Sequence, residues 1–137
     1  MTREEAKEEL QKIRKMDHRI KSVELEIERI ESVAMKMTPN YEGSIVSASH
    51  KNKIEEALIK KEEYVGKLAR YLTKQLNYKQ RCRSKIERIE PESLQMFLYY
   101  YYFDCLTMEK ISEIIDKSPR WTYELFCTAL DKYAEIS

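Results

Sequence analysis

The side chains best suited to metal binding or redox chemistry are three cysteines and two histidines, and their spacing fits neither purpose. Cys82, Cys105 and Cys127 are odd in number and form no C-x-x-C pair. His18 and His50 stand in different segments, without a cluster of cysteines or carboxylates that would complete a ligand set. We therefore expect no metal, no cofactor and no disulfide framework. The cysteines are expected to be small core residues in a reducing cytoplasm.

No catalytic motif accompanies these residues. The sequence contains no GxxxxGK[ST], GxGxxG, GxSxG or HExxH segment. Its 2 glycines are too few to build a glycine-rich phosphate loop. Carboxylates are abundant, but they alternate with lysine and arginine in the manner of exposed helix faces. We therefore expect that the protein is not an enzyme.

Charge is distributed unevenly along the chain. Residues 66–91 contain 8 Lys and Arg against 2 Glu, a net charge of +6, whereas residues 92–137 contain 4 basic and 8 acidic residues, a net charge of −4. A basic run of this kind can grip phosphate groups. The residues that could contact phosphate are Lys79, Arg81, Arg83, Lys85 and Arg88. Alternatively, the run is a solvated helix face, or it neutralises the acidic segment of its own chain or of a partner subunit.

The elements that carry these residues are expected to be helices. The chain has 137 residues, 36% of them charged, with only 2 Gly and 3 Pro, which is typical of long solvated helices and poor for sheets with tight turns. We therefore predict an all-α fold. The first ten residues are charged, and no apolar stretch reaches the roughly 18 residues of a membrane span. These features favour a cytoplasmic protein that does not enter a membrane.

Two long helices are predicted to precede the acidic segment. In the first, over about residues 2–36, apolar residues recur at steps of three and four and form a heptad seam. This seam consists of Ile13, Met16, Ile20, Val23, Ile27, Ile30, Ala34 and Met37. Pro39 and Gly43 then predict a break over residues 38–44. The seam of the second helix consists of Ile54, Leu58, Lys61, Val65, Leu68, Leu72, Gln75, Lys79, Cys82, Ile86 and Ile89.

Neither helix can bury its seam alone, so we expect the second to fold back on the first as an antiparallel, coiled-coil-like pair. Polar residues interrupt the second seam at Lys61, Gln75 and Lys79. They either set the register or lie beyond the first helix, where a third helix or a second copy would cover them. We therefore predict a helical hairpin over residues 1–90 and a homodimer.

Pro91 marks the start of a second predicted domain, residues 91–137, in which aromatic residues become dense. One helical face is formed there by Leu94, Phe97, Leu98, Tyr101 and Tyr102. The run of four tyrosines at 99–102 is expected to pack in a core or interface. Stacking on bases is disfavoured because the run lacks the nearby Lys and Arg of a single-strand groove.

Two further short helices are predicted in this domain. Thr107 can cap a helix that carries Ile111, Ile114 and Ile115. Ser118 and Pro119 then start the last helix, with a hydroxyl cap followed by proline at the first helical position. Three short helices with turns of about three residues match a helix-turn-helix unit.

This unit resembles the helix-turn-helix of sigma-factor region 4. The residues that carry the resemblance are those of segments 102–115, 117–123 and 129–130. The chain resembles, more specifically, small phage-encoded transcriptional regulators of the RinA and ArpU type, in which a helical N-terminal segment precedes a sigma-like unit. Residues 38–39 and 47–49 are similar to that family too, so the likeness spans most of the chain, and it is most specific over 111–130.

The resemblance implies sequence-specific binding of double-stranded DNA and regulation of transcription in a bacterial host cell. The last helix would lie in the major groove, and a dimer would read half-sites about one helical turn apart or a multiple of it. The residues that would face DNA are Lys110, Lys117, Ser118, Arg120, Trp121, Tyr123 and Glu124. Arg120 suits guanine or a phosphate, Ser118 a phosphate, and Glu124 the amino group of cytosine. The residues that would face the core are Thr122, Leu125, Ala129, Leu130, Ile111 and Ile114.

Two other interpretations stay open. The net charge of −4 and the aromatic side chains of Trp121 and Tyr123 favour a protein-interaction module that docks on RNA polymerase or another regulator without reading bases. A helix-turn-helix combined with helical oligomerisation also occurs in small DNA-packaging subunits of phage terminases. Steep salt dependence would favour DNA binding over docking, and ring-like oligomers would favour packaging.

Overall fold

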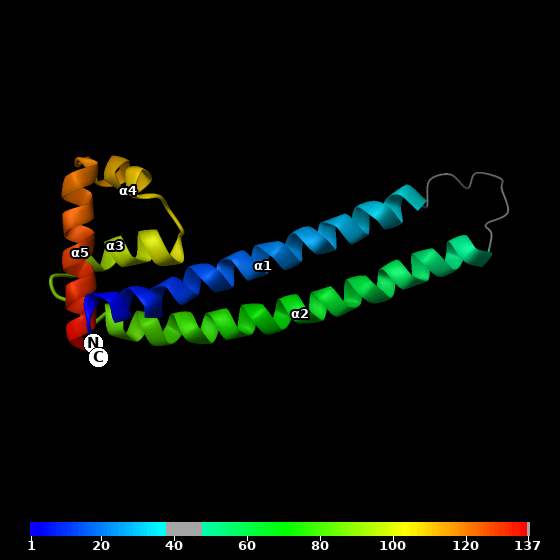
Figure 1. The fold of residues 1–137 in the computed structure, drawn as a ribbon, viewed down its shortest axis with the longest axis horizontal. Helices are drawn as coiled ribbons and strands as arrows, with labels where there is room; N and C mark the ends of the chain where they lie inside the picture. The colour runs from blue at the N-terminus through cyan, green and yellow to red at the C-terminus, as the bar shows by residue number, and fades with distance from the viewer. Residues whose placement is uncertain (38–47, 137) are drawn as a thin grey trace. The chain divides into compact units, whose positions relative to one another are not determined.

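The computed structural model describes residues 1–37 and 48–136. Two long helices come first, α1 (Arg3–Met37) and α2 (Ala48–Ile86). The short elements that follow are η1 (Glu92–Leu94), α3 (Gln95–Leu98), η2 (Tyr99–Phe103), α4 (Met108–Ile115) and α5 (Pro119–Ile136). No strand occurs in the described ranges, so the predicted all-α fold is confirmed (Figure 1). The predicted break over 38–44 lies outside the described residues.

The long helices run side by side in opposite directions, as predicted for a hairpin (Figure 1). The chain divides into two compact units, and each takes one part of α1 and one part of α2. The first unit contains residues 1–17 and 75–137, and the second contains residues 18–74. Both ends of the hairpin therefore belong to the same compact unit as the C-terminal helices, although Pro91 does separate α2 from the elements that follow.

In the second unit, α1 buries the seam that its heptad spacing predicts. Ile20, Val23 and Ile30 are buried, and Ile27 and Ala34 are half-buried. Apolar residues at steps of three and four form one stripe on a helix, and that stripe here faces the neighbouring helix. Beside it, the Nζ atom of Lys61 lies 3.0 Å from a carboxylate oxygen of Glu31 and links α2 to α1.

The seam of α2 differs from the prediction at three positions in its middle part, whereas Ile86 and Ile89 are buried as predicted. Ile54, Lys61, Leu68, Gln75 and Cys82 occupy inward positions as predicted, but Leu58, Val65 and Leu72 are between 45% and 49% exposed. The positions between the inward residues are instead taken by Ala57, Tyr64, Tyr71 and Tyr78, all half-buried. A tyrosine can bury its ring while its hydroxyl reaches a polar partner. A seam predicted from aliphatic residues alone therefore overlooks the tyrosines that face inward.

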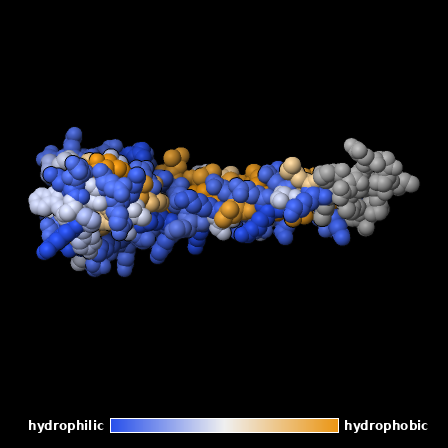
Figure 2. Space-filling model, turned by 90° about the horizontal axis from the view of Figure 1, so that it is seen from above, coloured by the Kyte–Doolittle hydropathy of each residue, from blue (hydrophilic) through white to orange (hydrophobic). Residues whose placement is uncertain are grey.

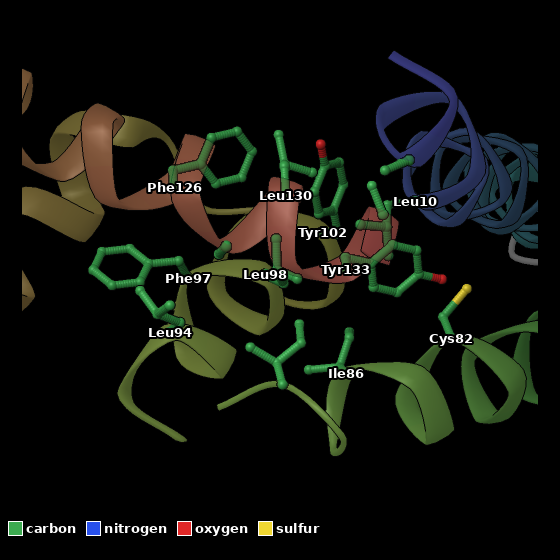
Figure 3. Packing of buried hydrophobic residues seen from close by; sticks show 14 of the residues in the cluster. Leu10, Cys82, Ile86, Leu94, Phe97, Leu98, Tyr102, Phe126, Leu130 and Tyr133 are labelled. Atoms are coloured by element: carbon green, nitrogen blue, oxygen red, sulfur yellow. The ribbon is translucent and has the colours of Figure 1, made fainter. Parts of the chain in front are cut away.

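The first unit is organised around a core to which every element contributes. α1 supplies Ala6, Leu10 and Ile13, and the end of α2 with the following turn supplies Cys82, Ile86 and Ile89. The core residues from the C-terminal elements are Leu94, Phe97, Leu98, Tyr102, Ile111, Phe126, Ala129, Leu130, Tyr133 and Ala134. Figure 3 shows Tyr133 of α5 between Leu10 and Cys82, so α5 packs directly on both hairpin ends.

Polar contacts reinforce this core at its edge. The Tyr78 hydroxyl donates to the backbone carbonyl of Glu9, and the Lys85 ammonium lies 3.0 and 3.1 Å from the two carboxylate oxygens of Glu9. On the other side, the Arg3 guanidinium donates two hydrogen bonds of 2.7 and 2.6 Å to Asp131 of α5. This bidentate contact lowers the pKa of the Asp131 carboxyl. These contacts join the start of α1 to the end of α2 and to α5.

Candidate nucleic-acid interface

The turn between α4 and α5 is built by a residue in the left-handed region. Asp116 has φ 54° and ends α4, and the backbone N–H of Lys117 donates to the carbonyl of Ser112 at 3.1 Å. Asp and Asn adopt this conformation more readily than other non-glycine residues. The chain therefore leaves α4 sharply, and α5 starts three residues later at Pro119.

Both helices of this pair begin with hydroxyl caps, as predicted. Thr107 Oγ1 accepts a hydrogen bond of 3.2 Å from the backbone N–H of Lys110 at the start of α4. Ser118 Oγ accepts one of 3.1 Å from the N–H of Trp121, and Pro119 is the first residue of α5. Each cap satisfies an N–H that has no partner within its own helix.

Buried side chains fix which face of α5 points outward. Thr122, Ala129 and Leu130 are buried as predicted, and the Thr122 hydroxyl donates to the Ser118 carbonyl at 2.9 Å. Phe126 also lies in the core and packs on Tyr102 with ring centres 5.8 Å apart. Leu125 is half-buried and packs against this core.

One predicted core position is wrong. Ile114 is 46% exposed, whereas Ile111 is fully buried and Ile115 packs against the core. Residues four apart lie above one another on a helix, so the pair Ile111 and Ile115 defines the inward face of α4 and leaves Ile114 at its edge. Ser112 is buried beside Ile111, and its hydroxyl donates a hydrogen bond of 2.6 Å to the carbonyl of Glu109.

All seven residues that the sequence predicted to face DNA are exposed. Six lie on the turn and the first two turns of α5, namely Lys117, Ser118, Arg120, Trp121, Tyr123 and Glu124. The seventh, Lys110, lies on α4. The side chain of Arg120 is 92% exposed. The structure therefore brings these residues to the surface around the start of α5, on a turn braced by a buried core.

The charges of this surface are partly paired within it. Arg120 Nε lies 3.6 Å from Glu124, and Lys110 Nζ lies 3.7 Å from Glu113. Lys117 makes no ion pair within the described residues. Exposed pairs of this length contribute little free energy, so a phosphate or a base edge can replace the carboxylate at small cost.

The five basic residues of α2 and the following turn do not form one free surface. Lys79 and Arg83 lie over the ring of Phe103, at 5.7 and 5.4 Å from its centre, and Arg81 lies 5.2 Å over the ring of Tyr78. Lys85 is bound to Glu9, as described above. Arg88 is exposed on the turn that follows α2. Lys85 therefore has a partner inside the fold, whereas Lys79, Arg83 and Arg88 are better placed to meet an added anion.

The end of α2 lies beside the C-terminal half of α5, away from the start of α5. The Lys85 ammonium is 5.4 Å from the ring centre of Tyr133, and Tyr133 follows Arg120 by 13 residues. At 1.5 Å per residue, this places Lys85 about 20 Å from Arg120 along the axis of α5. Lys85 and Arg120 are thus not adjacent parts of one surface.

The sequence did not associate α1 with this surface, but the structure does. A hollow of about 370 Å³ lies beside Tyr123 and Phe126, and α1 lines it with two carboxylates and two ammonium groups, those of Glu4, Glu8, Lys7 and Lys15. Arg14 of α1 stacks over the ring of Tyr101 in η2, with its guanidinium carbon 4.4 Å from the ring centre. The spacing of Lys7 and Lys15 places them on one helix face, but no local feature links that face to a residue more than 100 positions away.

The cysteines carry no sign of reactive chemistry. Cys82 is buried, and burial raises the pKa of its thiol, which disfavours the nucleophilic thiolate. Cys105 and Cys127 are half-buried, and neither forms a disulfide bond within residues 1–37 and 48–136. Across residues 1–37 and 48–136, no group of three or more His, Cys, Asp or Glu side chains is placed to hold a metal ion.

Neither comparison with known proteins nor the search for membrane-spanning helices identifies a function for this chain. No family model, no curated protein and no solved structure matches this chain. None of the described helices combines the length and the apolar character needed to cross a membrane. The assignment of function therefore depends on the surface around the start of α5.

Proposed function

We propose that this chain is a sequence-specific DNA-binding regulator of transcription, encoded by a phage or prophage and acting in the bacterial cytoplasm. The observation that carries the proposal is the α4–turn–α5 unit. Its turn is set by Asp116 and its second helix is capped by Ser118, so that a polar and aromatic face is presented on the first two turns of α5. This is the face that a recognition helix inserts into the major groove.

In this proposal, each exposed side chain has a defined task. Arg120 pairs bidentately with guanine, and Glu124, released from Arg120, accepts a hydrogen bond from the amino group of cytosine. The Ser118 hydroxyl and the N-terminus of α5 contact a phosphate, and Lys117 and Lys110 contact the flanking phosphates. Trp121 and Tyr123 contact sugar and base edges with their apolar surfaces.

The acidic C-terminal segment favours a second candidate function. Two of the three cations near the start of α5 already have a carboxylate neighbour, and Trp121 is 51% exposed. An exposed tryptophan beside paired charges suits a protein surface such as that of RNA polymerase better than a phosphate backbone. In this alternative, α5 docks on a protein and reads no bases.

The two functions are separated by the variants Arg120→Ala and Lys117→Ala. The wild-type protein is first used to select duplexes from a randomised library, and the affinity of each variant is then measured for the selected and a scrambled duplex. We expect Arg120→Ala to lower the preference about tenfold, because a lost guanine contact costs roughly 1–3 kcal/mol of discrimination.

Lys117→Ala serves as the matched control, because it removes a positive charge from the same surface. It should weaken binding to both duplexes by a similar factor and leave the ratio of the two affinities unchanged. An unchanged preference in Arg120→Ala, or a library from which the wild-type protein selects nothing, would support the docking function.

A further inference from the structure

A second apolar row on α2 remains uncovered in the unit formed by residues 18–74. This row, here named the α2 stripe, consists of Leu58, Val65, Ala69 and Leu72, which follow one another at steps of seven, four and three. All four residues are exposed. Steps of three, four and seven keep residues on one helix face. The stripe is distinct from the half-buried row of Ala57, Tyr64, Leu68 and Tyr71 on the same helix.

The α2 stripe has the dimensions of a helix-binding surface. From Leu58 to Leu72 it covers fifteen residues, and the fourteen steps between them span about 21 Å at 1.5 Å per residue. Hydrophobic side chains also reach the surface over the long helices in the view of Figure 2. An apolar seam with heptad spacing is the pattern by which one helix receives another. The stripe therefore fits a single amphipathic helix of about four turns.

Carboxylates border the α2 stripe on the side of α1. Lys61 lies between Leu58 and Val65 on α2, and its ion pair with Glu31 shows which face of α1 is nearest. Glu24 and Glu28 precede Glu31 by seven and three residues and thus belong to the same row of α1. The opposite side of the two helices holds a different hollow, lined by Arg29, Val33 and Lys60 among others.

The far border of the α2 stripe is acidic too. Glu55 and Glu62 stand three residues before and four residues after Leu58, so they lie directly beside it along the helix, and both are exposed. The positive residues near the stripe are Lys21, Lys51 and Lys61. Five carboxylates against three ammonium groups give the borders a negative balance.

This balance decides between the possible occupants. A second copy of the chain would bring the same acidic borders against one another, and juxtaposed like charges oppose association. A helix with an apolar seam and lysine or arginine on both flanks would place opposite charges along both borders. We infer that the α2 stripe is a docking site for a basic amphipathic helix of another protein. This inference does not depend on the proposed DNA binding.

A synthetic peptide can test the docking site on the 137-residue chain. The probe is a fluorescent 18-residue helix with leucine at the seam positions and lysine on the flanks, and its partner peptide carries glutamate in place of lysine. Binding is measured by fluorescence anisotropy. We expect the lysine peptide to bind and the glutamate peptide to bind at least tenfold more weakly.

Two matched variants locate the site. Leu72→Glu places a charge in the α2 stripe, whereas Ile59→Glu makes the same change of charge at an apolar residue that is 59% exposed on the same helix but outside the stripe. We expect Leu72→Glu to weaken binding of the lysine peptide at least tenfold. Ile59→Glu should keep the affinity for this peptide within about twofold of the wild-type value. Far-UV circular dichroism checks that both variants keep their helix content.

Glu62→Lys provides a test that removes no apolar side chain. It should weaken binding of the lysine peptide and strengthen binding of the glutamate peptide. The inference is overturned if the lysine peptide fails to bind or if Leu72→Glu binds it as the wild type does. It is also overturned if the wild type is a dimer that Leu72→Glu converts to a monomer, because the occupant is then a second copy. DNA affinity of Leu72→Glu should stay unchanged, which keeps this test separate from that of the proposed function.

Discussion

Tyr133 is the clearest case of a single residue whose energetics can be tested. Its ring is fully buried in the core, and its hydroxyl points towards Cys82 (Figure 3). Within the described residues this hydroxyl makes no hydrogen bond. A buried hydroxyl without a partner costs about 1–3 kcal/mol of desolvation. We therefore predict that Tyr133→Phe is at least as stable as the wild type at pH 7 in urea unfolding, and a loss above about 1 kcal/mol would contradict this.

The same residue predicts how stability falls at high pH. Burial raises the pKa of Tyr133 above its ordinary value near 10, so above pH 10 the phenol ionises in the unfolded chain before it does in the folded one. The buried phenol therefore leaves the free energy of unfolding unchanged below about pH 10 and lowers it as the pH rises further. Tyr133→Phe should therefore lose less stability than the wild type between pH 9 and 11. The half-exposed Tyr123, as Tyr123→Phe, is the control and should follow the wild type.

The start of α5 depends on one cap, which can be tested at the scale of the element. Ser118→Ala removes the acceptor for the Trp121 N–H and should cost about 1 kcal/mol of unfolding free energy. Thr128→Ala on the exposed side of the same helix is the control, because its hydroxyl only donates to the carbonyl of Glu124. Equal effects of the two substitutions would show that the cap does not determine the start of the helix.

The register of α2 makes a prediction that separates the observed seam from the one expected from aliphatic spacing. Tyr78 is half-buried and hydrogen-bonded to Glu9, whereas its neighbour Leu76 is 67% exposed. We predict that Tyr78→Ala costs about 2–3 kcal/mol and Leu76→Ala less than about 0.5 kcal/mol in urea unfolding. The reverse order would indicate that α2 is rotated relative to the structure.

Local signals account for what the sequence predicts at this scale. The heptad of α1, the caps at Thr107 and Ser118 and the termination before Pro91 depend on neighbouring residues, and the structure confirms each. On α2 the structure turns Tyr71 inward in place of Leu72, and Tyr78, seven residues further along the same row, donates to the Glu9 carbonyl of α1. Periodicity alone does not contain that information.

Long-range contacts explain what the sequence could not predict about the candidate interface. The exposure of Arg120 and Trp121 follows from the periodicity of α5, so the residues around its start could be named in advance. The pairing of Lys85 with Glu9 links residues 76 positions apart and leaves no local pattern. The same holds for the place of Lys7 and Lys15 beside Tyr123.

At the scale of the whole molecule, the first compact unit predicts that the C-terminal segment cannot fold alone. Its core needs Leu10 and Ile13 of α1 and Cys82 and Ile86 of α2. A fragment of residues 91–137 would expose that apolar surface, and so small a segment rarely builds a sufficient core. We predict that the fragment shows no cooperative thermal unfolding, while the full chain does. A cooperatively folded fragment with the DNA affinity of the full chain would contradict this.

DNA binding by the 137-residue chain decides whether α5 is a recognition helix. Fluorescence anisotropy with a duplex selected from a randomised library, at low and moderate salt and with excess scrambled competitor, measures affinity and preference together. We predict binding that weakens steeply with salt but withstands the competitor, because phosphate contacts are salt-dependent and base contacts are sequence-dependent. Absence of binding at low salt, or complete displacement by the scrambled duplex, would contradict the proposed function.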